Sequence, residues 1–157
     1  MYIDIDKMRD ESRVWVFQAD RKLTMQELTS IKSMSQEFTQ QWTAHNAQLL
    51  SSVAVYHNFF LVISVDEDSA SASGCSIDAM TRFIKEVGSR FGINFFDRSK
   101  VVVERNQNVD IIEFDTAAEL AKDDPSLLVF DNLIADIKEL RTDWRKRFVE
   151  SWHAKLV

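Results

Sequence analysis

The spacing of apolar residues predicts a chain that alternates strands with amphipathic helices. Residues 13–18 are mostly β-branched or aromatic, which is typical of a strand. Thr24 and Glu27 form a capping-box pattern, so a helix is predicted to begin just after Thr24. One face of that helix is apolar, with residues spaced by three or four, and these are Leu28, Ile31, Met34, Phe38 and Trp42. This stripe predicts a helix lying on a sheet.

Two strands and a second helix are predicted next. Residues 51–56 and 59–66 are apolar runs separated by His57 and Asn58, which favours a tight hairpin. The second run is apolar at nearly every position, so it is predicted to lie centrally in its sheet. A helix beginning near Ser76 follows, and Gly92 is placed to end it. Its apolar stripe comprises Ile77, Met80, Ile84, Val87 and Phe91.

The order of these elements predicts the fold class. Residues 100–105 read as a fourth strand, and a turn at 106–108 leads into another run at 109–114. Strand, helix, strand, strand, helix, strand is the order of a ferredoxin-like βαββαβ core. We therefore expect an α+β fold, with an antiparallel sheet backed by two helices. A C-terminal β/α extension follows, with a short helix at 116–122, a strand at 127–130 and a final helix carrying Ile134, Ile137, Leu140, Trp144 and Phe148.

Length and composition indicate one globular domain. The chain has 157 residues, of which 45% are hydrophobic and 28% charged. We expect a loosely held acidic leader at 1–12 and a single α+β domain at 13–157, divided into a core at 13–114 and an extension at 115–157. Whether the extension packs into the same core is left open by the pattern.

Charge and hydropathy narrow the partners and the compartment. The net charge is −6, from 19 basic and 25 acidic residues, which argues against nucleic acid as a partner. The longest apolar run, 59–65, is strand-sized, so no membrane span is predicted. The first residues lack the features of a signal peptide, and one cysteine forms no intrachain disulfide. These features favour the cytoplasm.

Motifs for cofactors and metals are missing. The three glycines, Gly74, Gly88 and Gly92, never precede a lysine, which excludes a P-loop and the dinucleotide fingerprint. One cysteine and three scattered histidines supply no zinc spacing. The acidic run at 66–68 lacks the alternating ligands of a calcium loop. We expect neither a cofactor nor a metal.

The segment from Asp66 to Asp78 carries the one catalytic hypothesis. Cys75 stands at the predicted start of the second helix, where the helix dipole and free N–H groups stabilise a thiolate. Asp66 ends the preceding strand, and His45 and His57 are candidate bases. The alternative is a small, buried, inert cysteine. The charge of Asp78 opposes a thiolate and supports that alternative.

The same segment has a binding hypothesis. The hydroxyls of Ser71, Ser73 and Ser76, with the helix N–H groups, could hold an anion, and Gly74 would allow close approach. Asp78 belongs to the same candidate segment. The alternative is that Ser76 only caps the helix.

Aromatic residues elsewhere have two interpretations. Trp42 and His45 lie near the end of the first helix, where Trp42 is first of all a packing residue. In the tail, Trp144 and Trp152 either pin the chain to the body or form an apolar patch for a partner.

Several short stretches resemble a known family. The chain is similar to small uncharacterised bacterial proteins often labelled "ABC transporter ATPase" at residues 15–18, 41–45, 65–67, 73–78, 96–98 and 151–154. The resemblance implies a cytoplasmic bacterial protein of unknown function and adds weight to the segment 66–78. The label itself does not fit, because an ATPase of that kind needs a P-loop and this chain has none.

Two classes of function follow. The first is a non-catalytic binding or interaction domain of the bacterial cytoplasm, with a protein partner or a second copy of the chain as its ligand. The alternative is a small thiol-dependent enzyme or redox sensor that uses Cys75 at a helix N-terminus. An enzyme needs Cys75 accessible with His45 or His57 beside it, whereas a binding domain needs an exposed apolar surface.

Overall fold

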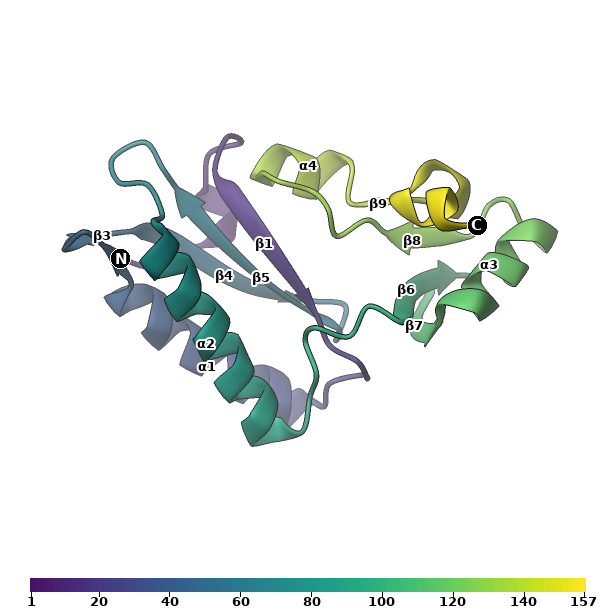
Figure 1. The fold of residues 1–157 in the computed structure, drawn as a ribbon, viewed down its shortest axis with the longest axis horizontal. Helices are drawn as coiled ribbons and strands as arrows, with labels where there is room; N and C mark the ends of the chain where they lie inside the picture. The colour runs from purple at the N-terminus through teal and green to yellow at the C-terminus, as the bar shows by residue number, and fades with distance from the viewer.

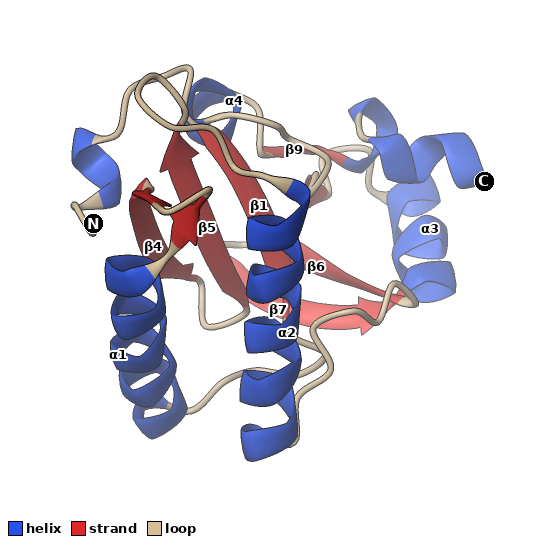
Figure 2. Ribbon diagram, turned by 60° about the vertical axis from the view of Figure 1, so that its left-hand side comes forward, coloured by secondary structure: helices blue, strands red, loops and turns tan.

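The computed structural model describes residues 1–157 and shows an α+β fold with antiparallel sheets. The first sheet has the order β1-β5-β4, and two helices cover one of its faces (Figures 1 and 2). The bounds of these elements are β1 Arg13–Gln18, β4 Leu50–Tyr56, β5 Phe60–Asp66, α1 Met25–Gln41 and α2 Gly74–Phe91. The predicted antiparallel sheet backed by two helices is present.

Local sequence signals explain these elements. Thr24 caps α1 in a full capping box with Glu27, as predicted. His57 and Asn58 both have positive φ, 56° and 64°, which is the backbone of a tight hairpin turn between β4 and β5. Every residue of β5 is buried because strands flank it on both sides and both of its faces are covered. The central position predicted for this strand is confirmed.

The second sheet has the order β7-β6-β8-β9 and corrects one prediction. Residues 100–105 do form a strand, β6, but it pairs with β7 and β8 instead of joining the first sheet. Val101 and Val103 pack against α3, and Val102 packs against the first sheet. In the second sheet β6 is therefore buried on both of its faces. The bounds are β6 Lys100–Arg105, β7 Asn108–Glu113, β8 Leu128–Phe130, β9 Arg145–Arg147, α3 Phe114–Asp123 and α4 Ile137–Thr142.

The C-terminal region differs from the predicted single helix. The helix α4 begins after Asp136, whose side chain accepts a hydrogen bond from the Glu139 N–H, and it ends at Thr142. Residues 145–147 pair with β8 as β9, because the backbone returns along that sheet. The remaining short elements are η1 Ile5–Lys7, β2 Thr43–Ala44, β3 Ala47–Gln48, η2 Phe148–Glu150 and η3 Trp152–Leu156.

The acidic leader is held against the body. The N-terminal amine of Met1 donates to the Leu49 carbonyl (2.9 Å), and Tyr2 forms a parallel bridge with Ser51. Met8 and Ser12 are buried. The expectation of a loosely held leader is wrong, because these contacts pair its backbone with β4 and bury its apolar side chain.

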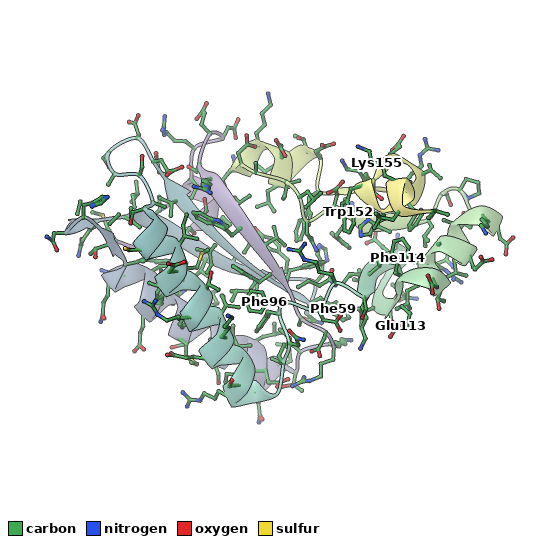
Figure 3. The ribbon with its side chains drawn as sticks, viewed as in Figure 1. Phe59, Phe96, Glu113, Phe114, Trp152 and Lys155 are labelled. Carbon is green, nitrogen blue, oxygen red and sulfur yellow. The ribbon has the colours of Figure 1, made fainter.

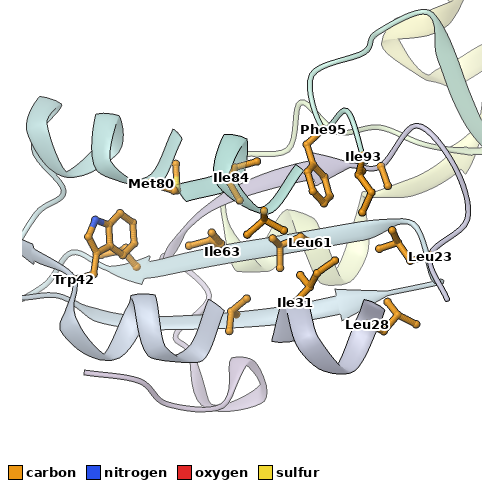
Figure 4. Close-up of a cluster of buried hydrophobic side chains, with 14 of the residues drawn as sticks. Leu23, Leu28, Ile31, Trp42, Leu61, Ile63, Met80, Ile84, Ile93 and Phe95 are labelled. Atoms are coloured by element: carbon orange, nitrogen blue, oxygen red, sulfur yellow. The ribbon is translucent and has the colours of Figure 1, made fainter. Parts of the chain in front are cut away.

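Three apolar clusters lie between the sheets and helices and hold them together. The largest fills the space between the first sheet and the helices α1 and α2 (Figure 4). A second cluster joins the opposite face of that sheet to β6, β8 and α4, through residues such as Val62, Val102 and Phe130. The third lies between the second sheet and α3. The region 115–157 therefore shares an interior with the first sheet. None of the helices is long and apolar enough to cross a membrane.

The end of α2 sets the path of the chain towards the second sheet. Gly92 ends the helix with a φ of 66°. The Gly88 carbonyl accepts a hydrogen bond from the Ile93 N–H (2.9 Å), and a Cβ on Gly88 would lie 2.4 Å from the Ile93 carbonyl oxygen. Only glycine allows this close approach. It holds Ile93 and Phe95 in the first core, so that the following residues cross beside β1.

Candidate functional site

The start of α2 contains the candidate residues predicted from the sequence. Most of its polar groups form hydrogen bonds with one another. Ser73 is the N-cap, and its Oγ accepts from the Ser76 N–H (3.1 Å). The Ser76 hydroxyl accepts from the Ser73 N–H (2.7 Å) and donates to the Ser73 carbonyl (2.8 Å). Ser73, not Ser76, therefore caps the helix, because the helix begins at Gly74. With both hydroxyls engaged in the cap, the capping interpretation accounts for them without an anion.

The loop before α2 is fixed in the same way. Arg9 donates two hydrogen bonds of 2.9 Å to the carboxylate of Asp66 and lowers its pKa. Asp66 also accepts from the Asp68 N–H (3.0 Å), and Glu67 accepts from the Ala72 N–H (2.9 Å). Asp66 thus joins the N-terminal segment to the end of β5 as a structural residue.

Cys75 is exposed on the first turn of α2, so the alternative of a small, buried cysteine is wrong. No hydrogen bond joins it to either candidate base. His57 sits in the β4–β5 turn, at the opposite end of the seven-residue strand β5, roughly 20 Å along the chain direction. His45 is exposed in the turn between β2 and β3, with a φ of 51°. The structure does not assemble a cysteine–histidine pair.

The remaining candidates in this region divide between interior and surface. Trp42 is buried, and its indole N–H donates to the Ser76 carbonyl (2.9 Å), which ties the end of α1 to the start of α2. Asp78 is exposed on α2, where it is the fifth residue of the helix. A side chain on Gly74 would meet open space. No group of three or more His, Cys, Asp or Glu side chains is arranged to hold a metal.

A cleft that the sequence did not reveal lies between the two sheets, beside β1. We call it the β1 cleft; its volume is about 360 Å³, and its lining comprises Val16–Gln18, Phe95–Arg98, Lys100, Asn132–Leu133 and Trp152–His153. Figure 3 labels Phe96 on the segment that leaves the first core and Trp152 near the C-terminal turns. A hollow of about 500 Å³ at the end of α2 is shallower and is lined mainly by that helix and the loop after it. The β1 cleft is the more enclosed of the two.

The floor of the β1 cleft is a hydrogen-bonded network. The Gln18 amide donates to the Lys100 carbonyl (3.1 Å) and accepts from the Asn132 amide (3.1 Å). Asn132 in turn accepts from the Trp144 indole N–H (2.9 Å). This network fixes β1, the start of β6 and the segment after β8 relative to one another, so the cleft has a defined shape.

Apolar and charged groups are exposed on its walls. Phe96 is 44% exposed and Leu133 is 68% exposed. Arg98 is exposed and forms no ion pair or hydrogen bond, whereas Asp97 accepts from both the hydroxyl and the N–H of Ser99 (2.6 and 2.8 Å). The Ser99 contacts lower the pKa of Asp97. The lining thus combines exposed apolar surface with a net positive charge, from Arg98 and Lys100 against Asp97.

The backbone edge of β1 contributes further groups. The Val14 N–H points away from β5, because it donates to the Ala135 carbonyl (3.0 Å), and the Ala19 N–H points towards β5, because it donates to the Phe59 carbonyl (2.7 Å). Backbone groups alternate in direction along a strand, so those of Val16 and Gln18 also point away from β5. No hydrogen bond in the molecule uses them on that side. This part of β1 is an unpaired sheet edge that lines the β1 cleft.

A serine and a histidine meet at the rim without forming a catalytic pair. Ser151 Oγ lies 3.0 Å from His153 Nδ1, but it also donates to the Phe148 carbonyl (2.7 Å) and caps η3 by accepting from the His153 N–H (3.2 Å). Both residues are buried. Burial lowers the pKa of His153 to about 4, so its imidazole is neutral at pH 7. Beside them, the indole N–H of Trp152 is buried without a partner.

Sequence reasoning missed the β1 cleft because its groups are far apart in the chain; Gln18 and Asn132 are separated by 114 residues. No protein family, curated protein or solved structure matches the chain.

Proposed function

We propose that this protein is a non-catalytic binding domain and that the β1 cleft is its binding site. The observation that supports this most is the lining itself, which combines exposed apolar side chains with hydrogen-bonding groups that the fold does not use. Ligand sites are typically concave, mostly apolar and provided with a few polar groups that fix orientation. The bacterial cytoplasm, as the setting of this function, rests on the sequence resemblance alone.

The chemistry of the lining supports binding over catalysis. Its side chains include no cysteine, and Ser151 at the rim is occupied by a carbonyl and by a helix cap. The carboxylate of Asp97 is held by Ser99. A nucleophile with a free base is thus missing from the cleft, whereas unpaired donors and acceptors are present.

Fragment screening by ¹H–¹⁵N NMR tests this proposal. We expect small aromatic acids and amides to shift the indole N–H resonance of Trp152 and the amide of Asn132, which line the cleft. The indole of Trp42 is an internal control, because it is buried in the first core and bonded to Ser76. Hits that shift Trp42 or the residues around Cys75, with no change at the cleft, would contradict the proposal.

The exposure of Cys75 keeps a second function open, a thiol-dependent enzyme or redox sensor. Its test is the rate of Cys75 alkylation on the folded protein as a function of pH. A thiolate that forms well below the free value of about 8.5 supports this function. If Cys75 is alkylated with the pH dependence of a free thiol, this second function is excluded.

A further inference from the structure

The free edge of β1 lies where the predicted fourth strand would have paired. In a split βαβ arrangement, the two strands that a helix connects are separated by one other strand. The strand after α2 would therefore pair with β1 on the side opposite to β5. In this molecule β6 belongs to the second sheet, and β1 has a full strand partner on one side only. On the other side, only its first residues are paired, through the bridge between Arg13 and Asp136.

We propose that the β1 cleft binds an extended acidic peptide segment of a partner protein, which pairs with β1 as an added strand. This inference rests on the proposed function and deepens it. The N–H and C=O groups of Val16 and Gln18 point out of the sheet edge and would form the main-chain hydrogen bonds. In strand addition such bonds supply affinity, and pockets for alternate side chains supply specificity.

The walls determine the side chains that the peptide carries. Phe96 and Leu133 are the exposed apolar side chains of the cleft, and they favour an apolar residue in the middle of the bound peptide. The lining carries the charges of Arg98 and Lys100 against the one carboxylate of Asp97, so its net charge is positive. Arg98 is the exposed member of the three that has no ion pair or hydrogen bond. A guanidinium pairs well with a carboxylate, often through two parallel hydrogen bonds. The cleft therefore favours an acidic peptide over a basic one.

The edge of the second sheet shows the contrast. There the Ile111 N–H of β7 donates a hydrogen bond to the carboxylate of its neighbour Asp110 (2.8 Å). Side chains that satisfy or charge an edge protect it against pairing with another chain. The edge of β1 at Val16 has no such group.

Selection from a display library of random nonapeptides tests the proposal, with the wild-type protein and Val16→Pro as baits. Proline removes the outward N–H of Val16 and is tolerated where that group faces away from the sheet. We expect acidic, extended sequences to be enriched by about tenfold on the wild type relative to Val16→Pro, since main-chain hydrogen bonds are lost. No selective enrichment, or enrichment of basic sequences, would overturn the proposal.

A selected peptide, made synthetically, gives the second measurement. Arg98→Glu changes an exposed residue without partners in the fold, so it tests the charge even if Val16→Pro does not fold. We expect it to weaken binding by about tenfold, and we expect N-methylation of alternate peptide amides to abolish binding. Binding that is unchanged by both modifications contradicts strand addition.

Two further outcomes separate the claims. If fragments shift Trp152 and Asn132 but no peptide binds, the binding cleft stands and the peptide ligand is wrong. If sedimentation shows that the wild type dimerises and that Val16→Pro and Arg98→Glu do not, the ligand of β1 is a second copy of the chain, and an acidic partner segment is excluded.

Discussion

The start of α2 and the β1 cleft differ in how their polar groups are used. At the start of α2, the side chains of Ser73, Ser76 and Asp66 are paired with neighbouring backbone or with Arg9. In the β1 cleft, Arg98 and the outward backbone groups of Val16 have no partner. A region whose polar groups are all satisfied internally is explained by folding, whereas unsatisfied groups at a surface cleft are available to a ligand. The residue types at the start of α2 therefore need no ligand to explain them, whereas the free groups of the β1 cleft are the basis of the binding proposal.

Truncation of Trp42 gives the largest expected effect and tests the structural role of the α2 start. Trp42→Ala removes a buried indole and leaves the Ser76 carbonyl without its donor. We expect a loss of about 3–5 kcal/mol in the free energy of unfolding, measured with urea. A loss below about 1 kcal/mol would show that this region does not support the fold.

The elements of the fold were predictable where the signal is local. The cap at Thr24 and the turn at His57 and Asn58 depend on adjacent residues, and both predictions are confirmed. The prediction that residues 100–105 join the first sheet was wrong, because the apolar pattern of a strand does not identify its partner strand. In the structure these residues pair along their whole length with β7 and at Val103 and Glu104 with β8. For the candidate site, the predicted helix was present but its start was two residues late, because both Ser73 and Ser76 are good capping residues and Ser73 is the one that caps. The pattern also could not show that the hydroxyls of Ser73 and Ser76 are already hydrogen-bonded to each other's backbone.

Acidification should lower the free energy of unfolding through His153, which lines the β1 cleft. His153 titrates near 6.5 when unfolded and near 4 when folded, so the unfolded chain binds more protons between these values. Stability is therefore complete above pH 6.5 and falls as the pH drops towards 4, by about 2–3 kcal/mol. Urea unfolding across this range measures the slope. His57, whose pKa desolvation also lowers, adds to it.

The control for that titration is His153→Gln. This variant lacks the titrating group, so its slope between pH 6.5 and 4.5 should be clearly shallower than that of the wild type, with His57→Gln as the matched variant in the β4–β5 turn. If the free energy of unfolding depends on pH equally in His153→Gln and the wild type, His153 is not the group responsible.

Two tryptophan-to-phenylalanine variants compare a bonded indole N–H at the start of α2 with an unbonded one beside the β1 cleft. Trp42→Phe keeps an aromatic ring but removes a bonded N–H, and should cost about 1 kcal/mol. Trp152→Phe removes a buried N–H that has no partner, so stability should stay the same or rise slightly. Thermal unfolding of both proteins gives the result. The reverse order would mean that the Trp152 N–H is bonded and the Trp42 N–H is not.

Cys75→Ser gives the smallest expected effect. The side chain is exposed and forms no hydrogen bond, so the change in stability should stay within about 0.5 kcal/mol. Binding of ligands at the β1 cleft should not change either. A loss of ligand binding in this variant would join the two regions into one site, against the present interpretation.

Hydrogen exchange of the β1 amides tests whether the outer edge of β1 is unpaired in the free protein. By NMR, the amides of Trp15 and Phe17, which point to β5, should exchange slowly, and those of Val16 and Gln18 should exchange fast. A selected peptide should then slow exchange at Val16 and Gln18 alone. Slow exchange at all four amides in the free protein would contradict the account, because the edge of β1 would already be paired.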